Sequence, residues 1–107
     1  MTSSFTRPKP LSAKEVREIV RDALEKGVYR ETSHAKFDHA ERMIGIQDVL
    51  YGLETDWRSC TPDEFNPVEW QWKYRIRTRD IDGENLTIIV AVDPRSRRFE
   101  VITRFHE

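Results

Sequence analysis

The sequence predicts an α+β domain in which N-terminal helices pack on one face of a three-stranded antiparallel β-meander. Apolar residues recur at helical spacing in the first half of the chain and at every second position in part of the second half. The length of 107 residues is close to the commonest size of one domain, and two domains would each be too small to bury a core. We therefore expect a flexible, proline-containing arm over residues 1–10 and a single domain over residues 11–107.

Composition narrows the functional classes. The formal net charge is −1, whereas a dedicated polynucleotide-binding domain is usually basic, so a nucleic-acid site must depend on a local excess of cations. Cys60 is the single cysteine, which excludes an internal disulfide and suits a reducing compartment. No stretch approaches the roughly 18 consecutive apolar residues of a transmembrane helix, and residues 1–10 lack the apolar segment of a secretory signal. We predict a cytoplasmic protein without a membrane partner.

Residues 13–26 carry the clearest helix signal. Ser12 and Glu15 have the spacing of a capping box, in which each side chain bonds the backbone N–H of the other residue. Gly27 follows the last turn, where a left-handed residue commonly ends a helix. One apolar stripe at helical spacing runs between them: Val16, Ile19, Val20, Ala23 and Leu24.

Two shorter helices are expected next. Phe37, Ala40 and Ile44 form a thin apolar stripe that predicts a helix from Ser33 to about Met43. Further apolar residues at helical spacing predict a third helix after Gly45, with Asp48 in its first turn, where a negative charge suits the helix dipole.

Residues 54–69 are expected to form an irregular acidic connection. They contain five acidic residues and one arginine, which gives a local net charge of −4. Pro62 and Pro67 lie in this stretch, and proline interrupts regular structure because it lacks an N–H.

The C-terminal half predicts three strands. Residues 70–79 alternate between apolar and polar side chains, the pattern of a half-buried strand. Asp82-Gly83 marks a hairpin turn. Residues 86–92 are apolar at nearly every position, as expected of a central strand, and residues 99–105 form the last strand.

A row of cations occupies the polar face of the first predicted strand. Strict alternation directs Trp72, Tyr74 and Ile76 toward the helices and the intervening cations to the opposite face, and we expect a further arginine from the third strand to join them. Arginine's planar guanidinium matches phosphate oxygens, which favours a phosphate-binding surface. The alternative is that these cations merely form the solvated face of a one-sided sheet. The cations concerned are Lys73, Arg75, Arg77, Arg79 and Arg104.

The second predicted helix carries His34 and Arg42 about two turns apart, on roughly one helix face. Histidine acts as a general acid or base near neutral pH, although His34 would equally serve as a capping or packing residue. His34 and His39 are five positions apart, whereas metal ligands on one helix face are three or four apart. We expect no metal site, and no nucleotide-binding or nucleophile motif predicts a cofactor.

These segments together resemble the family called domain of unknown function 4258, over roughly residues 30–105. The resemblance in the helical part lies in Ser33-His34-Ala35, Arg42, Ile44 and Asp48-Val49. In the strands it lies in Trp72-Lys73-Tyr74-Arg75-Ile76, Ile89-Val90-Ala91-Val92 and Val101-Ile102-Thr103.

That family is similar to the RelE/BrnT-like toxin superfamily, so the resemblance implies a RelE-like fold. Members of that superfamily pack helices on one face of a small antiparallel sheet and cleave RNA at the other face. The resemblance also implies that His34 and Arg42 occupy the family's His and Arg positions, with Arg75 in its first strand.

Two functions follow as hypotheses. The first is a RelE-like RNA-directed domain, the toxin of a toxin–antitoxin pair, which cleaves RNA without a metal. RNA or the ribosome and an antitoxin-like protein would be its partners. The alternative is a non-catalytic protein-interaction module that uses the same basic sheet face, with residues 54–69 covering that face in cis. The expected catalytic residues are His34, Lys73 and Arg75, and the expected binding residues are Arg42, Arg77, Arg79 and Arg104.

Overall fold

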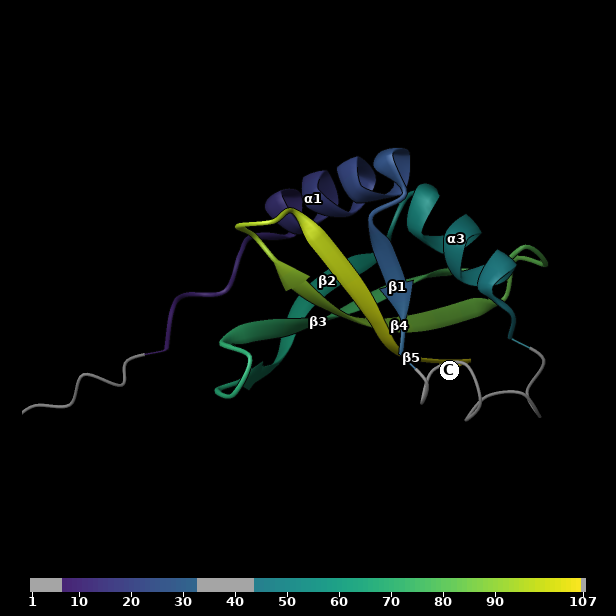
Figure 1. The fold of residues 1–107 in the computed structure, drawn as a ribbon. Coiled ribbons are helices and arrows are strands. Elements are labelled where there is room, and N and C mark those ends of the chain that lie inside the picture. The colour runs from purple at the N-terminus through teal and green to yellow at the C-terminus, as the bar shows by residue number, and fades with distance from the viewer. Residues whose placement is uncertain (1–6, 33–43, 107) are drawn as a thin grey trace, which may run out of the picture.

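The computed structural model describes residues 7–32 and 44–106. Within them, the fold is an α+β layer pair with two helices on one face of a five-stranded mixed sheet (Figure 1). The helices are α1 (Ala13–Lys26) and α3 (Ile46–Glu54). The strands are β1 (Tyr29–Glu31), β2 (Ser59–Asn66), β3 (Gln71–Arg79), β4 (Asn85–Asp93) and β5 (Arg98–His106).

The predicted three-stranded antiparallel meander is wrong. The sheet order is β1-β5-β4-β3-β2, so the meander of β3, β4 and β5 gains a strand on each side. The three meander strands themselves lie where the sequence predicted them. β1 pairs parallel to β5, which makes the sheet mixed, while the remaining pairs are antiparallel.

β2 forms in the stretch that was expected to be irregular. It is an edge strand, and a proline is tolerated at an edge because one side of the strand has no ladder partner to lose. Pro62 lies next to a β-bulge, at the register shift between Pro62 and Glu64. Pro67 falls in the turn that follows. The acidic side chains of this stretch lie on the edge strand β2, where charged residues hinder pairing with a further strand.

β1 is too short to leave a periodic signal. Its three residues pair with Phe99, Glu100 and Val101 of β5. The chain reaches this edge directly from α1, because Gly27 adopts a left-handed conformation (φ 70°) and its N–H bonds the end of the helix. The position at which α1 ends therefore places residues 29–31 beside β5, and this placement makes them a strand.

The two helices begin where the sequence predicts. Ser12 and Glu15 form the reciprocal capping box of α1, and Gly45 precedes α3 with Asp48 in its first turn. The helix expected from Ser33 to Met43 lies outside the described residues. No helix in the two described stretches is long and apolar enough to cross a membrane.

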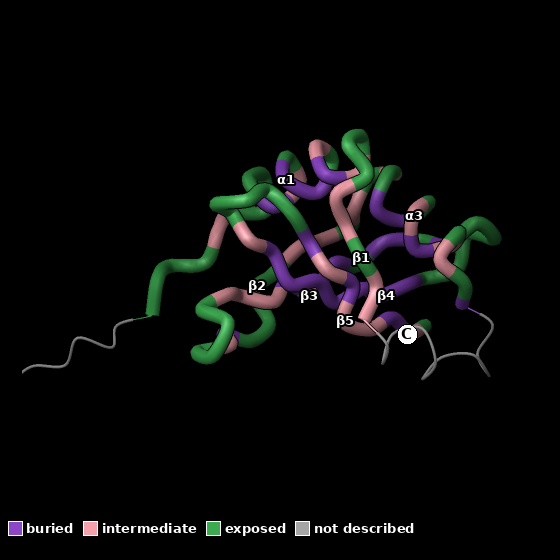
Figure 2. Tube along the Cα trace, viewed as in Figure 1, coloured by how far each residue is buried: buried purple, intermediate pink, exposed green. Residues whose placement is uncertain are grey.

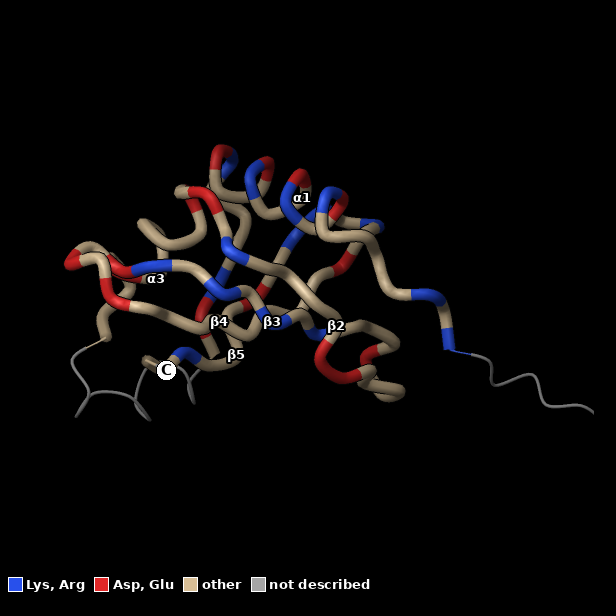
Figure 3. Tube along the Cα trace, turned by 180° about the vertical axis from the view of Figure 1, so that it is seen from behind, with Lys and Arg blue, Asp and Glu red and all other residues tan. Residues whose placement is uncertain are grey.

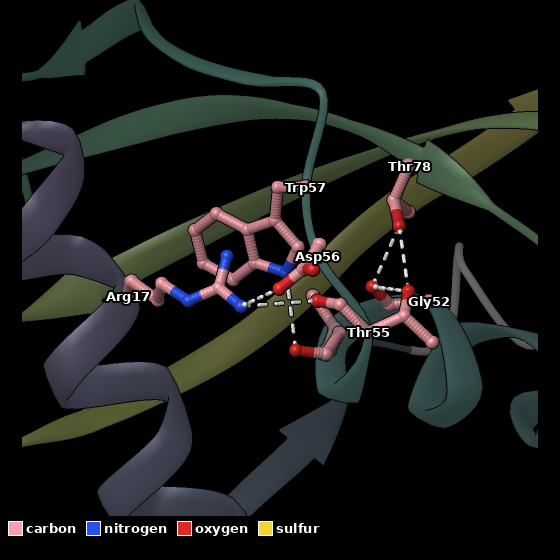
Figure 4. Close-up of polar contacts among 7 residues, drawn as sticks. Arg17, Gly52, Thr55, Asp56, Trp57 and Thr78 are labelled. Atoms are coloured by element: carbon pink, nitrogen blue, oxygen red, sulfur yellow. Dashed lines mark hydrogen bonds and ion pairs between the residues drawn. The ribbon is translucent and has the colours of Figure 1, made fainter.

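α3 approaches the sheet closely at Gly52. A Cβ atom added there would lie 2.7 Å from Thr78 Cγ2 and 3.1 Å from the Arg79 carbonyl oxygen, so only glycine fits. The Thr78 hydroxyl donates to the Gly52 carbonyl at 2.7 Å (Figure 4). Thr55 caps the same corner, and its hydroxyl lies 3.3 Å from both the Gly52 carbonyl and the Thr78 hydroxyl.

The core lies between the helices and the sheet (Figure 2). Tyr74 and Ile76 of β3 are buried in it, and Trp72 packs against its margin, as the alternation predicted. The largest fully buried members are Tyr74, Ile76, Leu86, Ile88, Val16, Val20, Val49, Val90, Val92 and Val101. The opposite face of the sheet carries no helix among the described residues, and we call it the helix-free face.

Candidate functional site

The basic row of β3 lies on the helix-free face, as predicted. Lys73, Arg75, Arg77 and Arg79 alternate with the core residues Tyr74, Ile76 and Thr78. β3 runs without a register shift against β4, so the four cations stay on one side along the whole strand. Lys73 and Arg75 are partly buried, and Arg77 and Arg79 are exposed.

Two of these cations are paired with carboxylates from β2. Lys73 Nζ lies 3.3 Å from Glu64 Oε1, and Arg75 Nη2 lies 3.2 Å from Asp63 Oδ1. Figure 3 shows the acidic segment at the β2–β3 hairpin close to the basic segments of β3. The basic row predicted for this strand therefore carries its own counterions on the side of β2.

The β-bulge in β2 brings these acids to the cations. Glu64 is the register partner of Lys73 and Thr61 that of Arg75, so Asp63 is extra to the ladder between them. A bulge offsets the alternation of a strand by one residue, which lets two consecutive acidic side chains reach one face. Without the bulge, Asp63 and Glu64 would point to opposite sides of the sheet.

The centre of the helix-free face is apolar beneath the cations. Ile89 is the register partner of Arg75 and is buried. The Arg75 guanidinium also lies 5.8 Å from the ring centroid of Phe105. Thr87, opposite Arg77, is fully buried, and its hydroxyl has no hydrogen-bond partner among the described residues. The arginine stems therefore cover apolar surface while their charged ends face outward.

Arg104 does not join the basic row, so this part of the prediction is wrong. Val101 pairs with Val90 but Thr103 pairs with Ile89, so β5 contains one extra residue, Ile102. This bulge reverses the alternation and puts Arg104 on the same face as its partner, the core residue Ile88.

Arg104 instead forms a buried ion pair. It is 4% exposed, its Nη1 is paired with Glu31, and its Nε donates to the Ile44 carbonyl at 3.1 Å. Burial lowers the pKa of the Arg104 guanidinium, but arginine stays charged in proteins. Arg104 therefore links Glu31 of β1 to Ile44, which lies just before α3. His34 and Arg42, the other predicted site residues, lie outside the described residues.

A shallow groove continues the helix-free face past Lys73. Its volume is about 520 Å³, and its lining includes Ala91, the register partner of Lys73. Its walls carry both signs of charge, with Arg30 and Glu100 forming an ion pair across β1 and β5. The helix-free face thus changes from mixed charge at the groove to cationic at Arg77 and Arg79.

Cys60 is not a reactive thiol in this fold. It lies in β2 as the register partner of Ile76 and packs against the core. Burial raises the pKa of its thiol to about 11, so almost none of it is thiolate at neutral pH.

The alternative hypothesis placed residues 54–69 over the basic face, but the sequence analysis did not single out Asp63 and Glu64, and it missed Glu31 as the partner of Arg104. The signal for the first two was present, because the acidic stretch directly precedes the basic strand and an antiparallel pair would set them side by side.

Comparison of the chain with protein-family models, curated proteins and solved structures gave no match.

Proposed function

We propose that this chain is a cytoplasmic RNA-directed domain that binds single-stranded RNA along β3. The observation that carries the proposal is the row of four cations on the helix-free face, two of which, Arg77 and Arg79, are exposed. Cations repeated at every second residue of a strand form a straight, rigid track. A phosphate backbone binds such a track through charge-assisted hydrogen bonds with arginine.

The carboxylates of β2 compete with RNA for part of this track. Asp63 and Glu64 occupy Arg75 and Lys73, whereas Arg77 and Arg79 at the other end of the strand are exposed to solvent. RNA that extends toward Lys73 has to displace these surface ion pairs. Each such pair contributes only about 0–1 kcal/mol, which a phosphate contact can replace.

RNA cleavage is the further part of the proposal, and it follows the sequence resemblance. Cleavage of this kind uses the 2′-hydroxyl as nucleophile, cations to stabilise the phosphate, and a proton-transfer group. His34 or Lys73 is the candidate for proton transfer and Arg75 for phosphate stabilisation. A toxin role would add an antitoxin-like protein as the natural partner.

Salt dependence of RNA binding tests the proposal. The affinity for a labelled single-stranded RNA, measured by fluorescence anisotropy, should fall with salt at a log–log slope of about −0.7 per phosphate contact. Arg77→Ala and Arg79→Ala should each weaken binding and reduce the slope by roughly one contact. Arg21→Ala is the matched control, because Arg21 is also exposed but lies on α1. Equal affinities for all three variants would refute the proposed RNA surface.

The competing carboxylates provide a second test. The double variant Asp63→Asn/Glu64→Gln removes both charges but keeps the side-chain shapes, and it should bind RNA more tightly than the wild type. Asp82→Asn changes the charge of an exposed residue in the β3–β4 turn and serves as its control. If the control tightens RNA binding equally, the effect is one of net charge rather than of competition at Lys73 and Arg75.

A protein-interaction module is the second candidate, and the same two ion pairs favour it. Lys73 and Arg75 bind carboxylates in the folded chain, so an acidic segment of another protein could replace Asp63 and Glu64. Binding of an acidic peptide through these residues, together with no binding of RNA at low salt, would support this candidate over the first.

For the RNA-directed proposal, His34→Ala separates cleavage from binding, since a proton-transfer group acts mainly on the transition state.

A further inference from the structure

A second charged cluster lies at the opposite end of the sheet from the groove. It consists of Asp80 directly after β3, Glu84 directly before β4 and His106 at the end of β5. His106 Nε2 lies 2.7 Å from Asp80 Oδ2 and 3.7 Å from Glu84 Oε2. One donor atom from each residue lies within 4.8 Å of the other two.

These distances are close to those between the ligands of a small divalent cation. Ligands at about 2.0–2.2 Å from a tetrahedral zinc ion lie roughly 3.4 Å from one another. The two observed distances from His106 fall on either side of that value, so movements of less than about 1 Å would bring the donors to a common centre. One imidazole nitrogen with two carboxylate oxygens suits zinc, whereas magnesium and calcium prefer oxygen ligands alone.

Hydrogen bonds around Asp80 orient its carboxylate toward His106. Asp80 is 3% exposed, and its Oδ1 accepts the Glu84 backbone N–H at 2.8 Å, which leaves Oδ2 facing His106. The Asp80 N–H also donates to the Glu84 carbonyl at 2.9 Å, which closes the turn between the two acidic residues. Outer hydrogen bonds of this kind orient the ligands in metal sites.

The cluster is also open to solvent on one side. A hollow of about 440 Å³ is lined by Gly83, Glu84, Asn85 and His106. A water molecule occupies about 30 Å³ in the liquid, so the hollow has room for a hydrated ion to enter and for water to complete its coordination. Two carboxylates beside one histidine also give this end of the molecule a negative potential that attracts cations.

We propose that Asp80, Glu84 and His106 form a zinc site that ties the end of β5 to the β3–β4 turn. His106 and Asp80 come from the side of the sheet that carries the helices, since His106 is the register partner of the core residue Leu86. The site is therefore separate from the cations of the helix-free face and does not depend on the proposed RNA binding.

Zinc titration by calorimetry tests the site in the full chain, purified without a polyhistidine tag. We expect one zinc ion per chain, a higher melting temperature with zinc, and no such effect with magnesium at the same concentration. Glu84→Gln and His106→Gln should each weaken zinc binding by at least roughly tenfold. Glu84 is exposed, so its substitution leaves the fold intact, and circular dichroism checks this for both variants.

Spectra locate the ion. Zinc should shift the backbone amide signals of residues 80–85 and 104–106 in a two-dimensional nitrogen–proton spectrum and leave those of α1 unchanged. The double variant His34→Gln/His39→Gln is the matched control and should bind zinc like the wild type. Absence of zinc binding, loss of binding in this control, or full binding in Glu84→Gln would each overturn the three-ligand site.

Discussion

β3 and β5 flank the same central strand, yet Arg75 and Arg77 of β3 lie on the opposite face of the sheet from Arg104 of β5. β3 pairs with β4 without interruption, so Arg75 and Arg77 face away from the helices. β5 carries an extra residue at Ile102, so Arg104 turns toward the helices and becomes buried. One bulge therefore separates a surface cation from a structural one on two strands that pair with the same neighbour.

The surroundings of the two arginines differ as much as their faces. The Arg75 side chain is 34% exposed and pairs with one carboxylate on the edge strand. The Arg104 side chain is 5% exposed and binds both a carboxylate and a backbone carbonyl. Exposed ion pairs contribute little to stability, whereas removing one member of a buried pair leaves an uncompensated charge. We therefore expect substitution by alanine to reduce stability strongly at Arg104 and only slightly at Arg75.

The largest effect is expected for Arg104→Ala. It should lower the free energy of unfolding by about 3–5 kcal/mol, because Glu31, whose side chain is mostly buried, would lose its partner. Chemical denaturation measures the loss, and Arg75→Ala is the matched control with an expected loss of about 0–1 kcal/mol. Similar losses for the two variants would mean that the bulge at Ile102 does not separate their environments.

A smaller loss is expected for Gly52→Ala, which tests how closely α3 packs on the helix side of β3. Alanine favours a helix over glycine by about 1 kcal/mol, but its methyl group would overlap Thr78 Cγ2 and crowd the Arg79 carbonyl. We expect a net loss of about 1–3 kcal/mol in the free energy of unfolding. Adding Thr78→Ser removes the overlapping methyl group and keeps the hydroxyl, so the double variant should recover part of the loss. A stabilised Gly52→Ala protein would contradict the close packing.

An effect of about 1 kcal/mol is expected for Ser12→Ala, away from both strands. The Ser12 hydroxyl accepts the Glu15 N–H at 3.2 Å, and alanine would leave that N–H without its protein partner. Urea denaturation measures the change, with Ser12→Asn as the control because asparagine also caps helices. An unchanged midpoint for Ser12→Ala would show that the capping box adds nothing to stability.

The smallest effect is expected for the double variant Asp63→Asn/Glu64→Gln. It breaks the ion pairs of Lys73 and Arg75, which are partly exposed, so the free energy of unfolding should change by less than about 1 kcal/mol. The same variant is the one proposed to bind RNA more tightly. A large loss of stability, measured by thermal denaturation, would mean that these carboxylates serve the fold rather than control access to the cations.

The sequence by itself determined the elements whose signals are local. The capping box and Gly27 define α1, and strict alternation defines β3 together with the face that its cations occupy. These signals suffice because helix ends and strand alternation depend on residues only a few positions apart. The meander of β3, β4 and β5 follows from them for the same reason.

Only the tertiary structure decided the elements that depend on a neighbouring strand. β2 is a strand because it pairs with the edge of β3 despite Pro62. β1 is a strand because the end of α1 places the following residues beside β5. Arg104 turned inward because β5 gains a residue relative to β4, and no local pattern distinguishes a bulged strand from a regular one. Asp80 and His106 meet for a related reason: they are 26 positions apart, and only the pairing of β3, β4 and β5 brings their side chains together.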